Sequence, residues 1–473
     1  MHKMKNKLHN TFLLMVLVMG GLAALHFLPV LSLGGSTLRK VDLLSDVRRK
    51  VKDNDVMGNN MLSADGMVSD TDTVAPLPVV KPPFIDSCKS GMVCIEDYSD
   101  STSRGMAHFY EALSELSAKG GSVRVAYFGD SYIEGDILTA DLRRLLQKEY
   151  GGRGVGYVPV TSRVSKFRPT VKHQFGGWKS HNVTDTIGFA RSKQDISNNY
   201  FQAKAGAYVS LEGMKKYAAG LDTCSVSSFF YLTDDSLRLT ALVNGKDKYE
   251  FNVVGDSTLQ CSSVKGKIGS VKWTVDKASE KALFYAVTMD SDNGVAVDNF
   301  STRGSSGQQI SGIPMSVLKR YNELRKYNLI VLQYGLNVAF EGGVNYNYYK
   351  EGMKPVVNML KKAFPESSIL IVGIGDRETK DEDGNLRTMP GVKNLIKYQQ
   401  ALAAETNVAF WNLYEAMGGE GSIVEMVNSK PAMANYDYTH INFNGGKHIA
   451  DLLFEALSYG KEQYEKRKAY EAE

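Results

Sequence analysis

Strand-like and helix-like apolar runs alternate in two separate stretches of the chain. Residues 122–130 (SVRVAYFGD) form a continuous apolar run that ends in a turn, and residues 136–150 carry apolar side chains at helical spacing. The same alternation returns later, with expected strands at 328–335, 367–376 and 407–416 and expected helices at 314–327, 346–364, 392–405 and 445–457. Strands alternating with helices of this length predict a three-layer α/β/α domain around a mostly parallel sheet.

Between these stretches, residues 160–297 show short runs with period-two alternation, such as AYVSLEG, LRLTALVNG and YEFNVVG. Asn244 and Gly245 separate two of the runs, which is a strong hairpin signal. The segment is far longer than a crossover needs. We therefore expect an inserted all-β sandwich that divides the α/β domain into residues 86–159 and 298–460, with a polar tail at 461–473.

The N-terminal region has the pattern of a membrane anchor. Residues 1–10 contain Lys3, Lys5 and Lys7, and residues 11–33 are apolar and carry no formal charge apart from a histidine cation. About 20 apolar residues match the thickness of a bilayer core, and no small-x-small cleavage site follows. This favours a transmembrane signal anchor over a cleaved signal peptide, although export by a signal peptide stays open.

Residues 34–85 are polar, end in the proline-rich run APLPVVKPPF and predict a stalk or linker. A short basic N-terminus usually stays in the cytoplasm, so we expect residues 1–10 to be cytoplasmic and the body to lie on the extracytoplasmic (periplasmic) side of the cell envelope. Basic residues between 39 and 52 weaken this orientation signal.

Composition excludes several classes of protein. The chain has 473 residues, and 56 Lys and Arg against 52 Asp and Glu give a net charge of +4, which is too even for a protein held on nucleic acid by its phosphates. The cysteines have no zinc-like spacing, and we expect neither a metal nor a cofactor. Pairing of Cys88 with Cys94 and of Cys224 with Cys261 is the simplest disulfide pattern, and free thiols fit equally well. The sequence does not indicate the oligomeric state.

Candidate chemistry lies where the predicted strands end, because open α/β sheets bind ligands at the carboxyl ends of their strands. Ser131 follows the first strand, Gly307 lies after residue 298, and Asn337 follows the strand at 328–335. Asp437 lies three residues before His440, a spacing that lets the carboxylate fix the tautomer of the imidazole. Of the eight histidines, only His440 combines a loop position after the predicted sheet with such a carboxylate.

Each of these residues also has a structural interpretation. Gly-Asp-Ser is a common turn composition, Asn337 could cap a helix and Gly307 could be a backbone hinge. Their order along the chain favours a functional interpretation. The blocks GDSYIEGD, RGSSG, YGLN and DYTH resemble those of the SGNH hydrolases, also called the GDSL esterase/lipase family. The resemblance covers residues 122–159 and about 298–458, and no Gly-x-Ser-x-Gly elbow surrounds the serine.

The resemblance implies a flavodoxin-like SGNH domain and a role for each block. Ser131 would be the nucleophile, His440 the general base and Asp437 the residue that orients the base. The N–H groups of Ser131 and Gly307 and the side-chain amide of Asn337 would form the oxyanion hole. Gly304 is the alternative to Gly307, which is preferred because it closes the Ser-Gly dipeptide that this block usually shows.

An insert between the first two blocks of an exported chain looks like that of the peptidoglycan O-acetylesterases, in which it resembles a carbohydrate-binding module. We therefore expect an O-acetylated glycan as the substrate and a Ser131 acyl-enzyme. An O-acetyltransferase and a non-catalytic glycan-binding protein are the alternatives. Asp376, Arg377 and Trp178 are weaker candidates for substrate contacts, since they could equally pair in solvent or pack in a core.

Overall fold

The computed structural model describes residues 32–33, 36–37, 82, 84–100, 104–185 and 187–473. Most of the predicted anchor and stalk, and the whole of residues 1–10, lie outside the described residues. Ser32–Leu33 (β1), the end of the predicted spanning segment, pairs instead with Ser36–Thr37 (β2) as antiparallel strands. Within the described part of the chain, no helix has the length and apolarity to cross a bilayer.

A six-stranded sheet forms the centre of the α/β part, in the order β14-β4-β15-β16-β19-β3. Its first five strands are parallel, and β3 pairs antiparallel at one edge. The strands are β3 (Glu96–Asp97), β4 (Ser122–Gly129), β14 (Gly294–Ser301), β15 (Leu329–Gln333), β16 (Ser368–Val372) and β19 (Ala409–Trp411). The five parallel strands follow the flavodoxin-like order 2-1-3-4-5, which places a ligand crevice beyond the carboxyl end of the first strand, β4.

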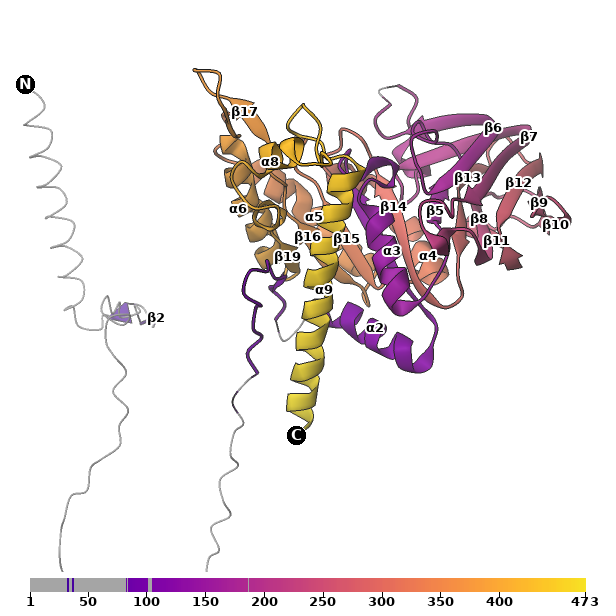
Figure 1. Ribbon diagram of the computed structural model, residues 1–473. Helices are drawn as coiled ribbons and strands as arrows, with labels where there is room; N and C mark the ends of the chain where they lie inside the picture. Colours follow the sequence, from indigo (N-terminus) through magenta and orange to yellow (C-terminus); the bar gives the residue numbers. More distant parts are fainter. Residues whose placement is uncertain (1–31, 34–35, 38–81, 83, 101–103, 186) are drawn as a thin grey trace, which may run out of the picture. The chain divides into compact units, whose positions relative to one another are not determined.

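Helices cover both faces of this sheet (Figure 1). One layer contains α2 (Ala107–Lys119), α3 (Thr139–Tyr150) and α9 (Phe443–Ala472), which pack on one another, and the other contains α4 (Met315–Arg325), α5 (Asn347–Ala363) and α6 (Pro390–Glu405). The helix predicted from residue 136 begins only at Thr139. The preceding residues, Gly135 and Asp136, have positive φ and form a separate short turn, η1 (Glu134–Asp136).

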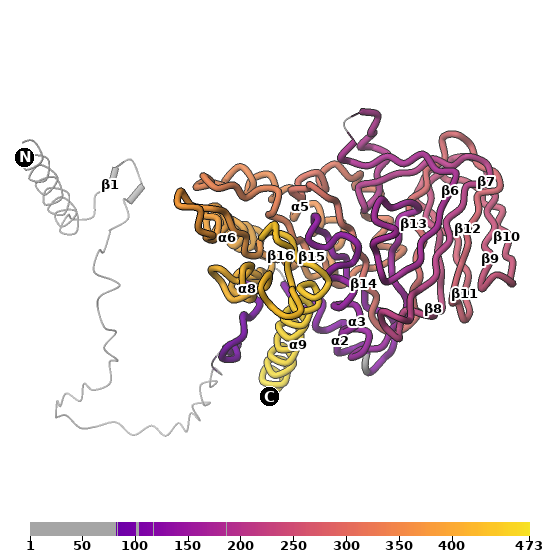
Figure 2. The backbone as a smooth tube through the Cα atoms, turned by 45° about the horizontal axis from the view of Figure 1, so that its top comes forward, coloured from indigo at the N-terminus to yellow at the C-terminus, as the bar shows by residue number. Residues whose placement is uncertain are grey.

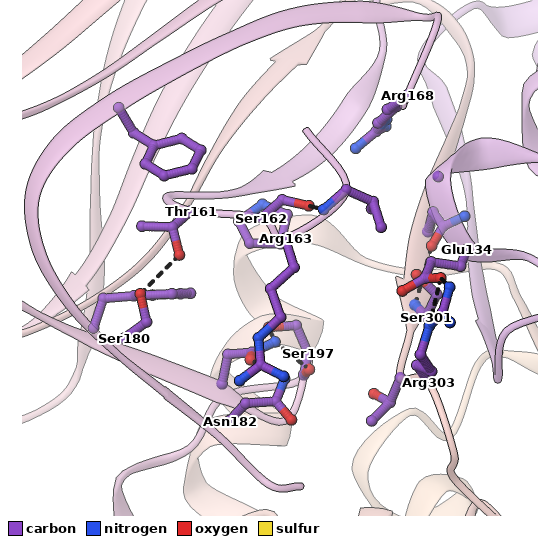
Figure 3. Close-up of a pocket in the computed structure, with 18 of the residues that line it drawn as sticks. Glu134, Thr161, Ser162, Arg163, Arg168, Ser180, Asn182, Ser197, Ser301 and Arg303 are labelled. Atoms are coloured by element: carbon purple, nitrogen blue, oxygen red, sulfur yellow. Dashed lines mark hydrogen bonds and ion pairs between the residues drawn. The ribbon is translucent and has the colours of Figure 1, made fainter. Parts of the chain in front are cut away.

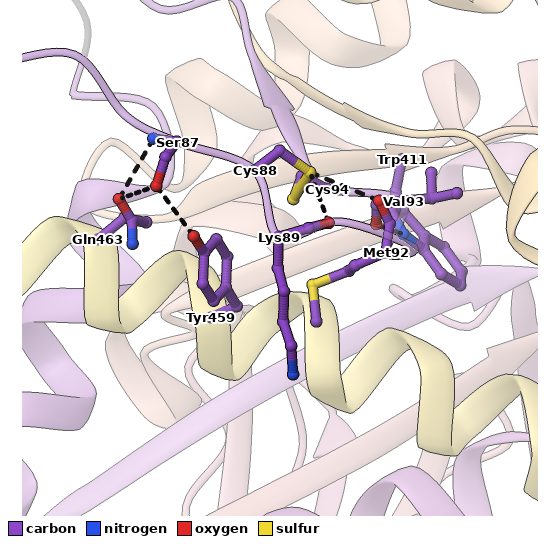
Figure 4. The surroundings of a disulfide bond; sticks show 9 residues. All are labelled: Ser87, Cys88, Lys89, Met92, Val93, Cys94, Trp411, Tyr459 and Gln463. Atoms are coloured by element: carbon purple, nitrogen blue, oxygen red, sulfur yellow. Dashed lines mark hydrogen bonds between the residues drawn. A yellow bond between two sulfur atoms is a disulfide. The ribbon is translucent and has the colours of Figure 1, made fainter.

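Residues 461–473, expected as a polar tail, continue the last helix. Helix α9 continues without a break to Ala472, and the side chains of Gln463 and Tyr464 are buried. The segment before β3 packs on this extension: Ser87 donates its N–H and its hydroxyl to Gln463 Oε1 (3.3 and 3.2 Å; Figure 4). The segment around Ser87, which is remote in sequence, therefore stabilises the end of α9, although most of its residues are polar.

A disulfide bond joins Cys88 to Cys94 in the same segment (Figure 4), as one of the two expected pairings requires. Trp411 of β19 donates its indole N–H to the carbonyl of Val93 (3.0 Å), which fixes the segment against the sheet. Cys224 and Cys261 are free thiols in the structure. They lie on paired strands, but the register places Cys261 opposite Phe230, six residues from Cys224, so their side chains cannot form a disulfide.

The residues between β4 and β14 form a second, nine-stranded sheet. Its strands are β5 (Gly156–Pro159), β6 (Val171–Asn182), β7 (Asn199–Gly213), β8 (Cys224–Leu232), β9 (Leu237–Val243), β10 (Asp247–Val253), β11 (Leu259–Ile268), β12 (Ser270–Lys277) and β13 (Leu283–Asp290). Asn244 and Gly245 have positive φ in the expected hairpin turn between β9 and β10.

This second sheet folds back on itself around an apolar core. Two strands, β7 and β13, separate β12 from β8 in the hydrogen-bonding order. Even so, Trp273 of β12 donates its indole N–H to Ser227 of β8 (3.2 Å) and its ring lies 5.7 Å from that of Phe229. The contacts cross between two layers, as in a sandwich.

The predicted boundaries of the insert need correction. The second sheet begins with β5 at Gly156, and residues 294–297 belong to β14 of the α/β sheet. Residues 81–473 form one compact unit. The backbone of the second sheet lies beside that of the α/β part (Figure 2). Tyr157 packs on Phe300 of β14 and Phe230 packs on Tyr321 of α4, with ring centroids 5.0 and 5.6 Å apart. The insert therefore has an apolar core of its own, and a second set of its side chains packs into the core of the α/β part.

Candidate active site

Ser131 lies in the sharp turn that follows β4. The N–H groups of Ile133 and Glu134 donate to the carbonyls of Asp130 and Ser131 (3.4 and 3.3 Å), which closes the turn. A Cβ at Gly129, the last residue of β4, would lie 2.9 Å from the Ile133 side chain and 3.1 Å from the carbonyl of Gln333. Glycine is needed there because the turn folds directly over the neighbouring strand.

Asp437 and His440 lie in the loop between α8 (Ser422–Asn428) and α9. One carboxylate oxygen of Asp437 accepts the backbone N–H groups of Thr439 (3.0 Å) and His440 (2.9 Å), and Tyr438 between them has φ +49°. The other oxygen lies 2.8 Å from Nδ1 of His440. The same carboxylate thus shapes the loop and orients the imidazole.

The structure brings Ser131, His440 and Asp437 into one hydrogen-bonded chain. Ser131 Oγ lies 3.0 Å from Nε2 of His440, although the two residues are 309 positions apart. Burial raises the pKa of Asp437, but hydrogen bonds from the backbone and ring of His440 outweigh it and hold the pKa below its ordinary value. The carboxylate is therefore ionised at neutral pH and stabilises a positive charge on the imidazole.

Asn337 follows β15 and faces the same turn. Its side-chain amide donates to Asp130 Oδ2 (3.1 Å) and to the carbonyl of Ser305 (3.0 Å), so both amide protons have acceptors. Asp130 is buried, and this burial raises its pKa to about 6. Because Asp130 also accepts the N–H of Tyr132 (3.0 Å), it connects the position of Asn337 to the serine turn.

The structure distinguishes Gly307 from Gly304. Gly307 has φ +87°, and a Cβ there would lie 2.7 Å from the ring of Tyr334, which directly follows β15 and lies three residues before Asn337. A Cβ at Gly304 would meet no atom within 4 Å. Gly304 also has positive φ (+75°), so the backbone favours glycine at both positions, but only Gly307 lies against the segment that carries Asn337.

Ser305 accepts hydrogen bonds from two of the predicted oxyanion donors, the amide of Asn337 and the N–H of Gly307. Its carbonyl accepts from Asn337, and its hydroxyl accepts the N–H of Gly307 (2.9 Å). Within the part of the chain that the structure describes, the N–H of Ser131 has no acceptor. An oxyanion at Ser131 could accept the N–H of Ser131 directly. The N–H of Gly307 and the amide of Asn337 would first have to release Ser305.

Comparison with known proteins gives the fold. No protein-family model matches the sequence, and no curated protein does. A solved structure of a peptidoglycan O-acetylesterase superposes with a TM-score of 0.64 at 19% identity, over 78% of this chain and 99% of that chain. The chain has the SGNH hydrolase fold.

Two further structures match at lower TM-scores. A putative GDSL-like lipase from Parabacteroides merdae matches at 16% identity and a TM-score of 0.26, over 35% of this chain and 74% of that chain. A family two carbohydrate esterase from Clostridium thermocellum matches at 11% identity and a TM-score of 0.26, over 61% of this chain and 100% of that chain. Superpositions this loose support no argument, and the likeness to the first structure concerns the fold alone.

The structure argues against substrate contact by Asp376. The side chain is completely buried, where its oxygens accept from Thr388 Oγ1 (2.8 Å) and the N–H of Ile423 (3.0 Å). It therefore connects the hairpin of β17 (Glu378–Lys380) and β18 (Leu386–Thr388) to α8. The hairpin in turn supports the histidine loop, since Glu378 donates its N–H to the carbonyl of Tyr438 (3.0 Å).

Arg377 and Trp178 lie in different surroundings. Arg377 donates from Nη1 to the carbonyl of Leu336 (3.1 Å), so it holds the backbone beside Asn337 and is a structural neighbour of the site. Trp178 is on β6 of the second sheet, where its indole N–H donates to the carbonyl of Tyr208 (2.7 Å), and one side of the ring lines a cavity. Trp178 therefore belongs to the wall of this cavity, on the second sheet.

Sequence reasoning missed two residues of the site, Asp130 and Ser305. Both lie inside the recognised blocks, next to Ser131 and two residues before Gly307, but nothing in the local pattern shows that they receive the amide of Asn337. Among the described residues, no group of three or more His, Cys, Asp or Glu side chains could hold a metal ion.

Proposed function

We propose that this protein is a serine esterase that removes O-acetyl groups from a glycan, with peptidoglycan as the expected substrate. The observation that carries the proposal is the hydrogen-bonded chain from Ser131 Oγ through His440 to Asp437. The match to a peptidoglycan O-acetylesterase along nearly the whole of that chain supports the choice of substrate. A protein that only binds glycans has no need for this arrangement, which argues against a non-catalytic function.

In the proposed reaction, Nε2 of His440 takes the proton of Ser131 Oγ while the oxygen attacks the acetyl carbonyl. The imidazolium that forms is stabilised by Asp437, and its proton then passes to the sugar oxygen as the ester bond breaks. This leaves acetyl-Ser131. Water, deprotonated by the same His440, attacks the acyl-enzyme and releases acetate, which restores the serine.

The oxyanion of each tetrahedral intermediate would be held by the N–H groups of Ser131 and Gly307 and the amide of Asn337. In this sequence of events, Asn337 gives up the carbonyl of Ser305 and keeps Asp130, so the amide stays oriented while one proton turns to the substrate. The ionised form of Asp130 is the better acceptor, because a charged partner strengthens the hydrogen bond.

Replacing Asn337 with alanine should lower kcat of acetyl-ester hydrolysis by about 100- to 1000-fold, because one oxyanion donor is lost. KM should change little, since the bond forms mainly in the transition state. Steady-state kinetics on 4-nitrophenyl acetate would measure both. Asn345→Ala, an exposed asparagine further along the same loop, is the matched control and should leave kcat unchanged. An equal loss of activity in both variants would contradict the assigned role.

Hydrolysis is favoured over acetyl transfer by the exposure of the site. The side chains of His440 and Asp437 are 40% and 50% exposed, so water reaches the general base. An acyltransferase must keep water away from its acyl-enzyme until the acceptor arrives. Transfer would nevertheless be revealed if an added acceptor glycan gained acetyl groups faster than free acetate appeared.

The substrate is tested by acetate release from O-acetylated peptidoglycan, acetylated xylan and a long-chain lipid ester. We expect the full-length chain to release acetate fastest from peptidoglycan and to leave the lipid ester intact. Faster release of acetate from xylan would indicate that the substrate is an acetylated polysaccharide other than peptidoglycan. Cleavage of the lipid ester alone would contradict a glycan esterase.

We also propose that the protein works outside the cytoplasm, attached to the membrane by residues 11–33. A peptidoglycan substrate and the Cys88–Cys94 disulfide support this location, because structural disulfides persist in oxidising compartments. Cell fractionation should find the full-length chain in the membrane fraction, and a soluble cytoplasmic protein would contradict the proposal.

A further inference from the structure

A cavity of about 690 Å³ lies between the second sheet and the α/β sheet, a size typical of ligand sites. It is lined by the serine turn at residues 134–136, by the loop at 161–168, by one face of β6 and by the end of β14 with the residues after it. Figure 3 shows Arg163 extending across the space between Thr161 and Ser180 on one side and Glu134 and Arg303 on the other. We call it the intersheet cavity.

The intersheet cavity begins one turn from the serine. Glu134, which lines it, donates its N–H to the carbonyl of Ser131 (3.3 Å). The Glu134 carboxylate accepts from Nε of Arg303 (2.9 Å), and Arg303 precedes Ser305 and Gly307 in the same loop. A glycan strand with one sugar at Ser131 would thus have the cavity directly beside it.

The wall of the cavity contains a buried guanidinium group whose hydrogen bonds are incomplete. The side chain of Arg168 is 9% exposed, and its Nε donates to Asp136 Oδ2 (2.8 Å) and Thr170 Oγ1 (3.1 Å). Its Nη2 forms an ion pair with Asp136 Oδ2 (2.8 Å) but is buried without an acceptor in hydrogen-bonding geometry. Asp136 is shared with the completely buried Arg143 (3.1 Å), so two guanidinium groups face one carboxylate.

Three arginines and three carboxylates line the cavity, and the completely buried Arg143 behind Asp136 adds one further positive charge. Arg303 is balanced by Glu134, and the exposed Arg163 lies 3.2 Å from the partly buried Asp185. The pair Arg143 and Arg168 has only Asp136 between them. Burial also lowers the pKa of Arg168, which means that its charge is poorly solvated and would be stabilised by a further anion.

The remaining lining suits a sugar. The hydroxyls of Thr161, Ser162 and Ser180 and the amide of Asn182 line it, and Trp178 contributes an aromatic surface. Such a mixture of hydroxyl partners and an aromatic face suits a polar ring with apolar C–H groups.

We propose that the intersheet cavity binds a carboxylate-bearing sugar of the glycan strand, with its carboxylate at Arg168 and Arg163. This inference rests on the proposed esterase function and specifies which glycans the esterase selects. A bidentate arginine contact distinguishes an acidic sugar from a neutral one of the same size. Neutral acetylated polysaccharides would then bind at Ser131 without this second contact.

Calorimetric titration tests the proposal in full-length protein with Ser131→Ala, which binds without turnover. The probes are N-acetylglucosaminyl-N-acetylmuramic acid, which carries a carboxylate, and the neutral N,N′-diacetylchitobiose. The acidic disaccharide should bind about 10- to 100-fold more tightly. Arg163→Gln, added to the same protein, should remove most of this difference. Arg168→Lys should weaken it too, provided that the melting temperature is retained.

Lys179→Gln is the matched control, because Lys179 is exposed on β6 between Trp178 and Ser180 and does not line the cavity. It should leave the affinity for both disaccharides unchanged. Equal affinities for the two disaccharides, no binding of either, or an Arg163→Gln affinity like that of the parent would overturn the inference. If wild-type protein hydrolyses no acetyl ester but the acidic disaccharide still binds selectively, the esterase proposal fails and the cavity assignment stands.

Discussion

Replacing Ser131 with alanine should reduce the turnover of a short acetyl ester by about 10⁴- to 10⁶-fold, to the level that binding and the oxyanion donors sustain alone. The reason is chemical: no other hydroxyl lies within hydrogen-bonding distance of Nε2 of His440 among the described residues. The initial rate of 4-nitrophenyl acetate hydrolysis by the full-length chain measures the effect.

Two companion variants separate chemistry from folding. His440→Ala should lose about as much activity as Ser131→Ala, and the double variant should lose little more, because a nucleophile and its base act as one unit. Ser311→Ala, an exposed serine in the short helix after Gly307, should keep the wild-type rate. Wild-type turnover in Ser131→Ala would refute the assignment of the nucleophile. If the double variant lost the product of the two single losses, the two residues would act independently, which would contradict the hydrogen bond between them.

The second large effect is expected from Asp437→Asn, which should lower kcat by about 10⁴-fold at neutral pH. In the wild type, the carboxylate accepts from Nδ1 of His440 and so leaves Nε2 free to take the serine proton. An amide nitrogen at the same place would donate to Nδ1 and favour the tautomer with the proton on Nε2. The base would then face Ser131 with its proton already in place.

Asp381→Asn is a matched control for this variant. Asp381 also accepts backbone N–H groups within a short turn, from Asp383 (3.0 Å) and Asn385 (2.8 Å), but it contacts no histidine. Its replacement tests the loss of a turn carboxylate without the loss of an imidazole partner. A kcat for Asp437→Asn close to that of Asp381→Asn would show that Asp437 shapes the loop and does not orient the base.

The local sequence pattern was sufficient to predict the α/β part and to predict that the loops after its strands lie close together. Ser131 and Asn337 follow buried strands whose parallel pairing places their carboxyl ends side by side, so their proximity follows from the alternation of strands and helices. The Asp-x-x-His spacing likewise predicted a carboxylate beside the imidazole. These features depend on periodicity and short-range geometry, which a single sequence displays.

The features that the sequence did not reveal depend on contacts between distant segments. Strand β13 is buried on both faces because it packs against the α/β part, and alternation cannot show that a sheet has a second buried side. Asp376 follows a strand in the same way as Ser131, yet it is enclosed by Thr388 and α8. The engagement of Asn337 and Gly307 by Ser305 also depends on how two loops pack, and no residue type predicts it.

Direct detection of the acyl-enzyme tests the central claim most directly. Full-length protein turning over 4-nitrophenyl acetate would be quenched in acid, digested and examined by mass spectrometry. We expect one acetyl group on the peptide that contains Ser131, and none in the Ser131→Ala protein treated in the same way. An acetyl group on a different residue, retained in the Ser131→Ala protein while ester turnover continues, would contradict the account.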